Sequence, residues 1–290
     1  MAALPPPYAG IAAKKGVRGA RVRPVGFWGL ERRDAIAVAT FTRPPRNLMS
    51  MAAMSELEPL LAEVATDETV NVLVLTGGIP GYFIAHADLD DLTTLARGEQ
   101  VDGDPASWGR ALGLLESMPQ PVVAAINGQA WGGGCEISLA CTIRVAARSA
   151  HIGQPEVVVG IIPGAGGTQR LPRLIGAGRA ADLILTGRVI DADEAERIGL
   201  VNAVHPDEGF LEAVLEDAGV IADRPRHAVV AAKRAMVEGL RLPLDQGLAL
   251  EGELFEECQA RPDTVELEET AAGIERSAPA RQRLDTDQDR

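Results

Sequence analysis

Aromatic residues, cysteines and long apolar runs are all scarce in this sequence. Aromatics make up 3% of the 290 residues and hydrophobic residues 46%, so the core must be mainly aliphatic. The three cysteines are odd in number and irregularly spaced, which gives no disulfide framework or zinc pattern and favours a reducing, cytoplasmic setting. No apolar run approaches the ~20 residues that a membrane-spanning helix needs.

Positive charge is also in the minority. The net charge of -13 argues against general nucleic-acid binding, which requires a basic face. An anionic small ligand is still compatible with this balance, because a few local arginines can hold phosphate groups. We therefore expect no nucleic-acid and no membrane partner.

The N-terminal segment lacks acidic residues and combines Pro5-Pro6-Pro7 with five lysines and arginines. A basic leader of this kind is compatible with targeting, but it has no apolar h-region, and its composition favours a disordered tail. We predict three parts: a flexible extension over residues 1–27, an α/β core over 28–225 and a helical C-terminal region over 226–290.

The most informative stretch runs from Pro121 to Glu156. An apolar strand over residues 121–126 ends at a turn pair, Asn127-Gly128, and is followed by a cluster of three glycines and a second apolar segment. A strand, a glycine cluster and a helix in this order leave free backbone N–H groups at a helix N-terminus, where they can bind negative charge. The carboxylate of Glu136 lies one turn inside that helix.

A second carboxylate, Glu156, follows in the segment Gln154-Pro155-Glu156. The apolar residues after it, at 157–159, predict that it stands at the edge of the core. Paired carboxyl groups in a partly dry site can share one proton and serve as acid and base. The alternative is a solvated glutamate at a helix start plus a glutamate in a turn.

Before this stretch the chain predicts two strand-turn-helix units. Residues 34–41 read as the first strand, Ser50 caps a helix through about residue 64, and residues 71–76 form a buried strand. A loop over 81–89 leads into an acidic helix start, and a further helix is expected over 107–118. If the loops at 85–88 and 132–134 face each other, their N–H groups could converge on one oxygen as an oxyanion hole. Two ordinary tight turns are the alternative.

After Glu156 a second glycine-rich loop, residues 160–168, opens a helix at about Thr168. It carries neither the G-x-G-x-x-G fingerprint nor the Gly-Lys-Ser/Thr of a P-loop, which excludes nucleotide hydrolysis. A short strand is expected at 200–204, among helices predicted at about 177–186, 191–198, 208–223, 226–239, 243–259 and 263–276. The apolar faces of the last helices need a partner surface, either the core or a neighbouring subunit.

Together these residues resemble the enoyl-CoA hydratase/isomerase, or crotonase, family over residues 35–277. The most specific segments are Phe83-Ile-Ala-His-Ala-Asp-Leu89, Asn127-Gly-Gln-Ala-Trp-Gly-Gly-Gly-Cys-Glu136, and Gly153-Gln-Pro-Glu156 running on to Leu171. The resemblance implies an α/β spiral of ββα units and a C-terminal helical region that assembles trimers or dimers of trimers. It also implies acyl-CoA substrates, with coenzyme A as part of the substrate and no metal or other cofactor.

Position by position, the resemblance implies roles for four residues. The N–H groups of Ala87 and Gly133 match the pair that holds the thioester oxygen, and Glu136 and Glu156 match the two acids that handle water across a 2-enoyl double bond. We expect Glu156 to protonate C2 and Glu136 to act on the water. The presence of both acids favours a hydratase, a lyase of fatty acid metabolism. The alternatives are an enoyl-CoA isomerase and a non-catalytic acyl-CoA binding subunit.

The sequence departs from the family pattern at two positions beside these residues. His86 stands where relatives usually have glycine, and it either narrows the acyl tunnel or faces outward. Trp131 replaces a smaller apolar residue, and it either shapes the acyl pocket or packs in the core.

The remaining assignments concern substrate and coenzyme A. Arg43 and Arg46 lie on the loop where relatives place basic groups near the CoA phosphates; simple surface charge is the alternative. Ala85 and Asp88 flank the segment whose backbone lines the adenine and pantetheine path. On the same resemblance, substrate contacts are assigned to Leu89, Gly132, Pro155 and Gly164.

Overall fold

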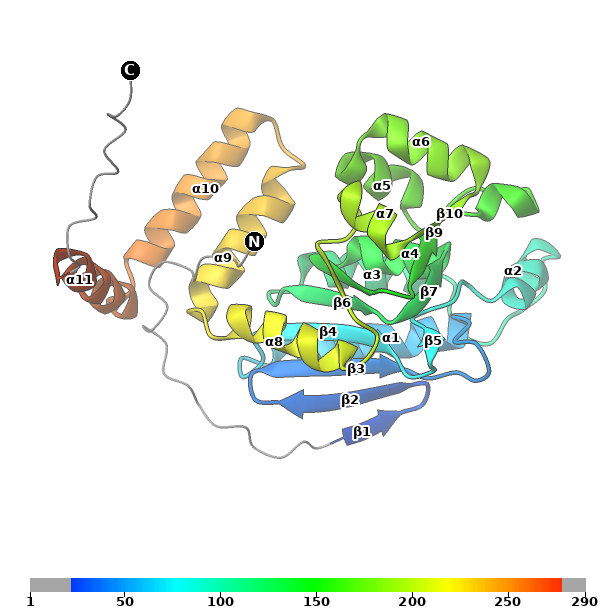
Figure 1. Ribbon diagram of the computed structural model, residues 1–290, viewed down its shortest axis with the longest axis horizontal. Helices are drawn as coiled ribbons and strands as arrows, with labels where there is room; N and C mark the ends of the chain where they lie inside the picture. Colours follow the sequence, from blue (N-terminus) through cyan, green and yellow to red (C-terminus); the bar gives the residue numbers. More distant parts are fainter. Residues whose placement is uncertain (1–21, 278–290) are drawn as a thin grey trace, which may run out of the picture.

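The computed structural model describes residues 22–277, and the larger of its two sheets has seven strands (Figure 1). The strand order is β1-β2-β3-β4-β6-β8-β11; β1, β2 and β3 are antiparallel neighbours and the other pairs are parallel. Parallel strands buried on both faces read as continuous apolar runs, and every residue of β6 is indeed buried. The strands are β1 (Val22–Val25), β2 (Trp28–Arg33), β3 (Ile36–Phe41), β4 (Val72–Gly77), β6 (Val122–Ile126), β8 (Ile143–Ala147) and β11 (Ala203–His205).

A second, four-stranded sheet has the order β10-β9-β7-β5. Its strands are β5 (Gly81–Tyr82), β7 (Gly128–Trp131), β9 (His151–Gly153) and β10 (Val189–Asp191). Strands β4, β6 and β8 of the large sheet are each followed by a short strand of this small sheet before the chain enters a helix. This repetition of two strands and a helix is the predicted spiral of ββα units.

Helices cover both faces of the large sheet. On one face, α8 packs through Phe210, Val214 and Ala218 against apolar side chains of β3, β4, β6 and β8. The other face carries the larger core, which includes buried residues of α1, α3 and α4. The helices before the C-terminal region are α1 (Met51–Thr66), α2 (Leu89–Ala96), α3 (Ser107–Ser117), α4 (Gly133–Ala140), α5 (Gly167–Ile175), α6 (Ala177–Thr186), α7 (Ala192–Arg197) and α8 (Phe210–Ala222), with a 3₁₀ turn η1 (Glu156–Val159).

Local capping fixes the start of two helices that border the site. The Ser50 hydroxyl accepts a hydrogen bond from the amide of Ala53, which confirms the predicted N-cap of α1. The Asp88 carboxylate accepts from the amide of Asp90 and begins α2. The backbone connects the two helix starts, since the amide of Asp88 donates to the carbonyl oxygen of Met49, the residue before Ser50, at 2.8 Å.

The C-terminal helices α9 (Arg226–Gly239), α10 (Leu244–Gln259) and α11 (Pro262–Ser277) lie to one side of the sheets (Figure 1). Lys233 of α9 is buried, and its Nζ donates to Met118 O at 2.7 Å and Gln120 O at 2.8 Å beyond the end of α3. Burial lowers the pKa of Lys233 to about 8. This contact anchors the helical region to the core.

Several elements differ from the sequence predictions. Residues 34–41 do not contain the first strand, because β1 and β2 precede β3, and the predicted extension over residues 1–27 therefore overlaps the sheet. Pro24 is compatible with β1 because β1 lies at the edge of the sheet. Residues 1–21 lie outside the described part of the chain. The strand expected at 200–204 is observed at Ala203–His205, and the short strands β5, β7, β9 and β10 were not predicted.

Between residues 22 and 277, no helix combines the length and apolar character needed to cross a membrane. The same described residues contain no group of three or more histidine, cysteine, aspartate or glutamate side chains placed to hold a metal ion.

Candidate active site

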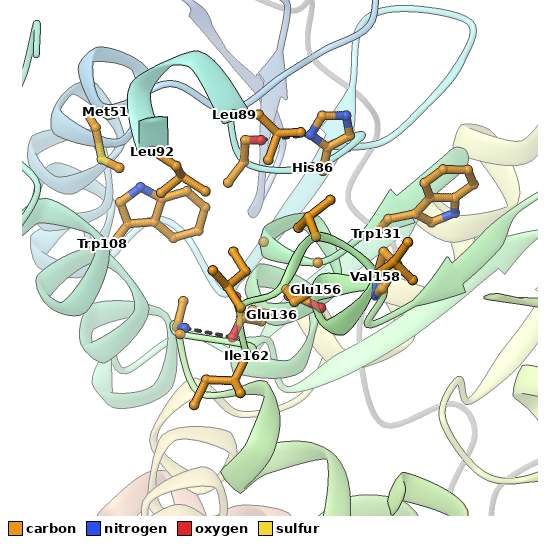
Figure 2. A pocket seen from close by; sticks show the side chains of 18 of the residues that line it. Met51, His86, Leu89, Leu92, Trp108, Trp131, Glu136, Glu156, Val158 and Ile162 are labelled. Atoms are coloured by element: carbon orange, nitrogen blue, oxygen red, sulfur yellow. Dashed lines mark hydrogen bonds between the residues drawn. The ribbon is translucent and has the colours of Figure 1, made fainter. Parts of the chain in front are cut away.

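A cavity of about 480 Å³ opens where α2, α3, the start of α4 and the η1 turn meet (Figure 2). Most of its lining is apolar, and both predicted acids point into it. It is lined by Met51, His86, Ala87, Leu89, Leu92, Pro105, Trp108, Trp131, Gly132, Gly133, Glu136, Pro155, Glu156, Val158, Val159, Ile161, Ile162, Gly164 and Ala165. Residues more than 100 positions apart in the sequence, such as Met51 and Ala165, therefore line the same cavity.

The two loops predicted to face each other do so. A methyl group placed on Gly133 would lie 3.2 Å from Cβ of Ala87, so the two residues are direct neighbours. The loops are also joined by a hydrogen bond from Trp131 N to Ala85 O of 3.0 Å. Neither the Ala87 nor the Gly133 amide donates to another group within residues 22–277. Both N–H groups are therefore available to a ligand in the cavity.

Glu136 is 3% exposed and is held by the second glycine-rich loop. Its Oε1 accepts hydrogen bonds from the amides of Ala165 (2.7 Å) and Gly167 (2.8 Å). Burial raises the pKa of Glu136, while these two amides and the nearby Arg170 act in the opposite direction. With Oε1 occupied by amides that favour the carboxylate, Oε2 remains for a water or a substrate atom.

Glu156 is held differently, at the first residue of η1. Burial, together with the negative charge of Glu136, raises the pKa of Glu156 to about 7. One end of the side-chain amide of the fully buried Gln154 lies 2.8 and 3.1 Å from the two carboxyl oxygens, and it donates to them when the amide nitrogen is assigned to that end. Glu156 also packs against Gly132, whose φ of 49° and lack of a side chain allow the close approach. A carboxyl group with this pKa is partly protonated at neutral pH.

Both residues that depart from the family pattern line the cavity. Nδ1 of His86 lies 2.7 Å from Ala87 O, and because a carbonyl only accepts, Nδ1 carries the proton. Trp131 is partly buried and lies on the side of the cavity away from Trp108 (Figure 2). The structure therefore favours the cavity interpretation for both residues over an outward histidine and a core tryptophan.

Four predicted substrate-binding residues do not line the cavity. Ala85 is buried and connects two loops through its backbone. Asp88 is buried as the cap of α2 and accepts from Arg43 Nη1 at 2.7 Å. Arg46 is exposed on the proline turn. The Arg43 guanidinium is thus already paired with a carboxylate, which weakens the expectation that it binds phosphate.

Sequence reasoning missed most of the apolar wall. Val158 and Val159, expected near the core, are 72% and 59% exposed and border the cavity instead. They lie on a 3₁₀ turn, in which consecutive side chains point outward in different directions. Trp108 is the second residue of α3 and comes close to Gly133, where an added methyl group would lie 2.7 Å from the Trp108 Cη2. Nothing in the local sequence of α3 signals that contact.

Comparison with known proteins agrees with this geometry. A family model described as enoyl-CoA hydratase/isomerase matches residues 31–279. The chain is 40% identical over 238 residues to a crotonyl-CoA hydratase of Syntrophomonas wolfei, covering 82% of this chain and 91% of that protein. It is 37% identical over 239 residues to a 2,3-dehydroadipyl-CoA hydratase of Escherichia coli, covering 82% and 92%.

Among solved structures, an enoyl-CoA hydratase from Bacillus anthracis superposes with a TM-score of 0.77 at 37% sequence identity, covering 90% of this chain and 98% of that chain. An enoyl-CoA hydratase from Geobacillus kaustophilus gives a TM-score of 0.81 at 30% identity, covering 90% and 98%. The predicted resemblance and the predicted α/β fold class are both confirmed. By its sequence and by its crotonase fold, the chain belongs to the enoyl-CoA hydratase/isomerase family.

Proposed function

We propose that this protein is an enoyl-CoA hydratase, a hydro-lyase that adds water across the 2,3 double bond of a 2-enoyl-CoA. The observation that carries the proposal is the meeting of four groups at one apolar cavity: the carboxyls of Glu136 and Glu156 and the backbone N–H groups of Ala87 and Gly133. Neither N–H donates a hydrogen bond within residues 22–277. Relatives that carry hydratase names support the same reaction class.

The two amides support the electronic part of the reaction. Oxygen adds to C3 of an unsaturated thioester only if negative charge can move to the thioester carbonyl oxygen. The N–H groups of Ala87 and Gly133 would donate to that oxygen as the enolate forms. Each preorganised donor of this kind contributes on the order of 10² to 10³ in rate.

The unequal environments of the two acids support separate roles. Glu136, whose Oε1 accepts two amide hydrogen bonds, takes a proton from water through Oε2 while the hydroxide oxygen bonds to C3. Glu156, whose pKa of about 7 keeps it partly protonated, gives its proton to C2. The carbonyl then re-forms, and the product is the 3-hydroxyacyl thioester. A positioned acid or base typically contributes ~10² to 10⁴ in rate.

Hydration of crotonyl-CoA, followed as the loss of ultraviolet absorbance of the enoyl thioester, tests the proposal. We expect turnover by the wild-type protein and a loss of ~10²-fold or more in kcat for Glu136→Gln and for Glu156→Gln. Binding of a saturated acyl-CoA, measured by calorimetry, should be largely retained, because glutamine preserves the shape of the cavity. Glu208→Gln, a change at an exposed glutamate, is the control.

A 3-enoyl-CoA offered in parallel separates hydration from isomerisation. Conversion of that substrate to a 2-enoyl-CoA faster than crotonyl-CoA is hydrated would overturn the assignment. A protein that binds acyl-CoA and converts neither substrate would be a binding subunit.

We also propose that the functional unit is a trimer or a dimer of trimers. Exposed apolar side chains on α9, on α10 and just after α9 support this: Met236, Leu240, Leu244, Leu248 and Phe255 are each more than half exposed in the single chain. Contacts of Arg43 and Arg46 with the coenzyme A phosphates remain part of the proposal for the substrate. For Arg43, binding a phosphate group would require the guanidinium to give up its ion pair with Asp88.

A further inference from the structure

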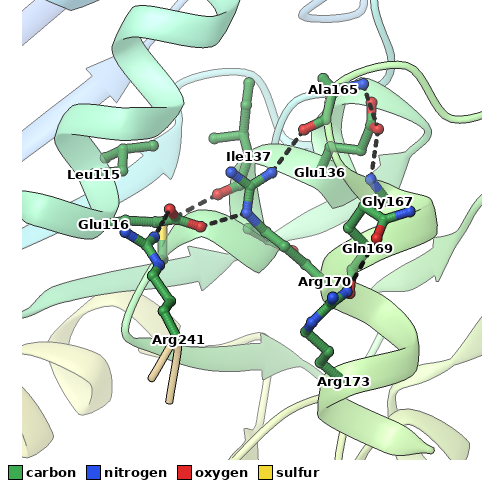
Figure 3. A network of polar contacts seen from close by, with 12 residues as sticks. Leu115, Glu116, Glu136, Ile137, Ala165, Gly167, Gln169, Arg170, Arg173 and Arg241 are labelled. Atoms are coloured by element: carbon green, nitrogen blue, oxygen red, sulfur yellow. Dashed lines mark hydrogen bonds and ion pairs between the residues drawn. The ribbon is translucent and has the colours of Figure 1, made fainter. Parts of the chain in front are cut away.

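The loop whose amides donate to Glu136, residues 165–167, is itself bonded to a series of charged side chains (Figure 3). These are Arg170, Glu116 and Arg241. Ala165 donates its amide hydrogen to Glu136, and its carbonyl oxygen accepts from Arg170 Nη1 at 2.7 Å. The peptide groups on both sides of Ala165 are therefore fixed, one by the acid and the other by the guanidinium. The guanidinium also lies close against Gly166, where any side-chain carbon would come within 2.0 Å of Nη1.

Arg170 is fixed in turn by Glu116 of α3. Its Nε donates to Glu116 Oε1, and both side chains are about three-quarters buried. The other carboxylate oxygen of Glu116 accepts from Arg241, in the segment between α9 and α10. Arg170 thus donates from Nε to Glu116 and from Nη1 to Ala165, and two charge-assisted bonds from different nitrogens of one planar guanidinium restrict its position more than a single contact does.

We propose that Arg170, anchored by Glu116, is a positioning residue that holds the Ala165–Gly167 amides on Glu136 and so keeps that acid in its water-activating state. This inference rests on the proposed hydratase function, since Arg170 is assigned a role in positioning and ionising Glu136, one of the two acids of that reaction. Arg170 itself does not line the cavity.

The charges around Glu136 support a specific role for this one cation. Within residues 22–277, the titratable groups that act on Glu136 or are acted on by it are Arg170 of α5, Glu156 of η1 and the neighbouring thiol of Cys135. Burial raises the pKa of the Cys135 thiol, so it stays uncharged. Arg170 is then the cation that opposes the burial of Glu136, and it does so both by its charge and by placing two amide donors.

The test compares Arg170→Met with Arg173→Met. Arg173 lies one turn later on α5 and is exposed, and among the described residues its hydrogen bonds stay within its own helix, to Gln169. Loss of Arg170 should lower kcat for crotonyl-CoA by about 10-fold to 10²-fold, because small misplacements of a reacting group are that costly, with little change in KM. Glu136 must be ionised to act as base, so the acid limb of the pH profile of kcat should move to higher pH. Arg173→Met should change neither kcat nor the limb.

A conservative variant separates charge from geometry. Arg170→Lys keeps the positive charge, so its acid limb should lie between those of the wild type and Arg170→Met. A purely structural role predicts a different result: a lower melting temperature and less active protein, with the acid limb unmoved. That result would overturn the proposal, as would a rise in KM at unchanged kcat.

A readout independent of turnover keeps this proposal apart from the hydratase assignment. Titration of glutamate side-chain carboxyls by ¹³C NMR, with the Glu136 signal identified by its loss in Glu136→Gln, reports the pKa directly. It should rise in Arg170→Met. If the wild-type protein does not hydrate crotonyl-CoA but this rise is seen, the hydratase assignment fails and the positioning role stands. An unmoved Glu136 pKa removes the positioning role whatever the activity.

Discussion

Glu136 and Glu156 are the same residue type in one cavity, yet their surroundings make them chemically unequal. Burial raises the pKa of Glu136, but Glu136 also accepts hydrogen bonds from two backbone amides and has an arginine close by, and both act to lower that pKa. Among the described residues no cation lowers the pKa of Glu156 in this way, and burial, together with the charge of Glu136, raises it to about 7. The two carboxyl groups therefore differ in the donors and charges around them, which is the condition under which one of a pair can serve as the acid and the other as the base.

The raised pKa of Glu156 makes a prediction for stability. The folded protein keeps the Glu156 proton up to about pH 7, whereas the unfolded chain loses it near the ordinary value of 4.5. The free energy of unfolding must then fall as pH rises from about 4.5 to about 7, and the loss is complete above that range. Glu156→Gln removes this loss. The melting temperature of the variant minus that of the wild type should therefore be greater at pH 8 than at pH 5, by ~2 °C or more.

Differential scanning calorimetry at several pH values measures this difference. Glu208→Gln, at an exposed site, should show the same shift at both pH values. A melting-temperature difference for Glu156→Gln that does not depend on pH would mean that the folded pKa is not raised.

At the scale of the elements, the approach of α4 to the loop after β5 decides the shape of the site. A methyl group on Gly134, the second residue of α4, would lie 1.9 Å from the carbonyl oxygen of Ile84. That carbonyl belongs to the backbone that leads to Ala87, so it cannot move without moving the proposed oxyanion donor. The glycine is therefore required by packing between two elements rather than by its backbone angles.

Two glycine-to-alanine changes in helices should consequently have opposite effects. Gly134→Ala should destabilise the protein by about 1–3 kcal/mol, the usual cost of overpacking, and lower kcat as the loop shifts. Gly113→Ala, at an exposed position of α3 with open space around it, should stabilise by about 0.5–1 kcal/mol and leave kcat unchanged. Urea unfolding and crotonyl-CoA turnover measure both quantities. Equal stability of the two variants would contradict the close approach.

Elements were predicted from sequence with unequal success for a physical reason. The helices at 177–186 and 226–239 were predicted at their observed bounds, because helical periodicity is carried by contiguous residues. The strands of the small sheet have two to four residues each and pair across long sequence separations, as Gly81 with Gly128 does. Too few residues carry the alternation that would reveal them.

At the scale of the whole molecule, the C-terminal helices present an uncovered apolar face. Leu244, Leu248 and Phe255 of α10 are 79%, 56% and 60% exposed. Exposed apolar patches of this kind commonly mark a protein interface. The sequence already predicted that these faces need a partner, and the structure shows that the core of the same chain does not cover these three side chains.

We expect light scattering to give the mass of a trimer or a dimer of trimers for the wild-type chain. Replacing Leu248 and Phe255 together by aspartate should lower that mass, because the two positions lie seven residues apart on one face of the helix and a charge there opposes burial. Glu253→Gln, at an exposed position on the same helix, is the control. A wild-type protein that stays monomeric across the concentration range would contradict the proposed trimer or dimer of trimers.

The sequence alone determined the features that depend on a few neighbouring residues. These are the glycine clusters, the helix caps, the two acids of the ordered motifs and the family they indicate. The tertiary structure decided which distant side chains meet, such as Arg170 with Glu116, 54 residues away, and Trp108 with Gly133. It also decided the unequal chemistry of Glu136 and Glu156, because burial and amide donors belong to packing and cannot be read from residue type.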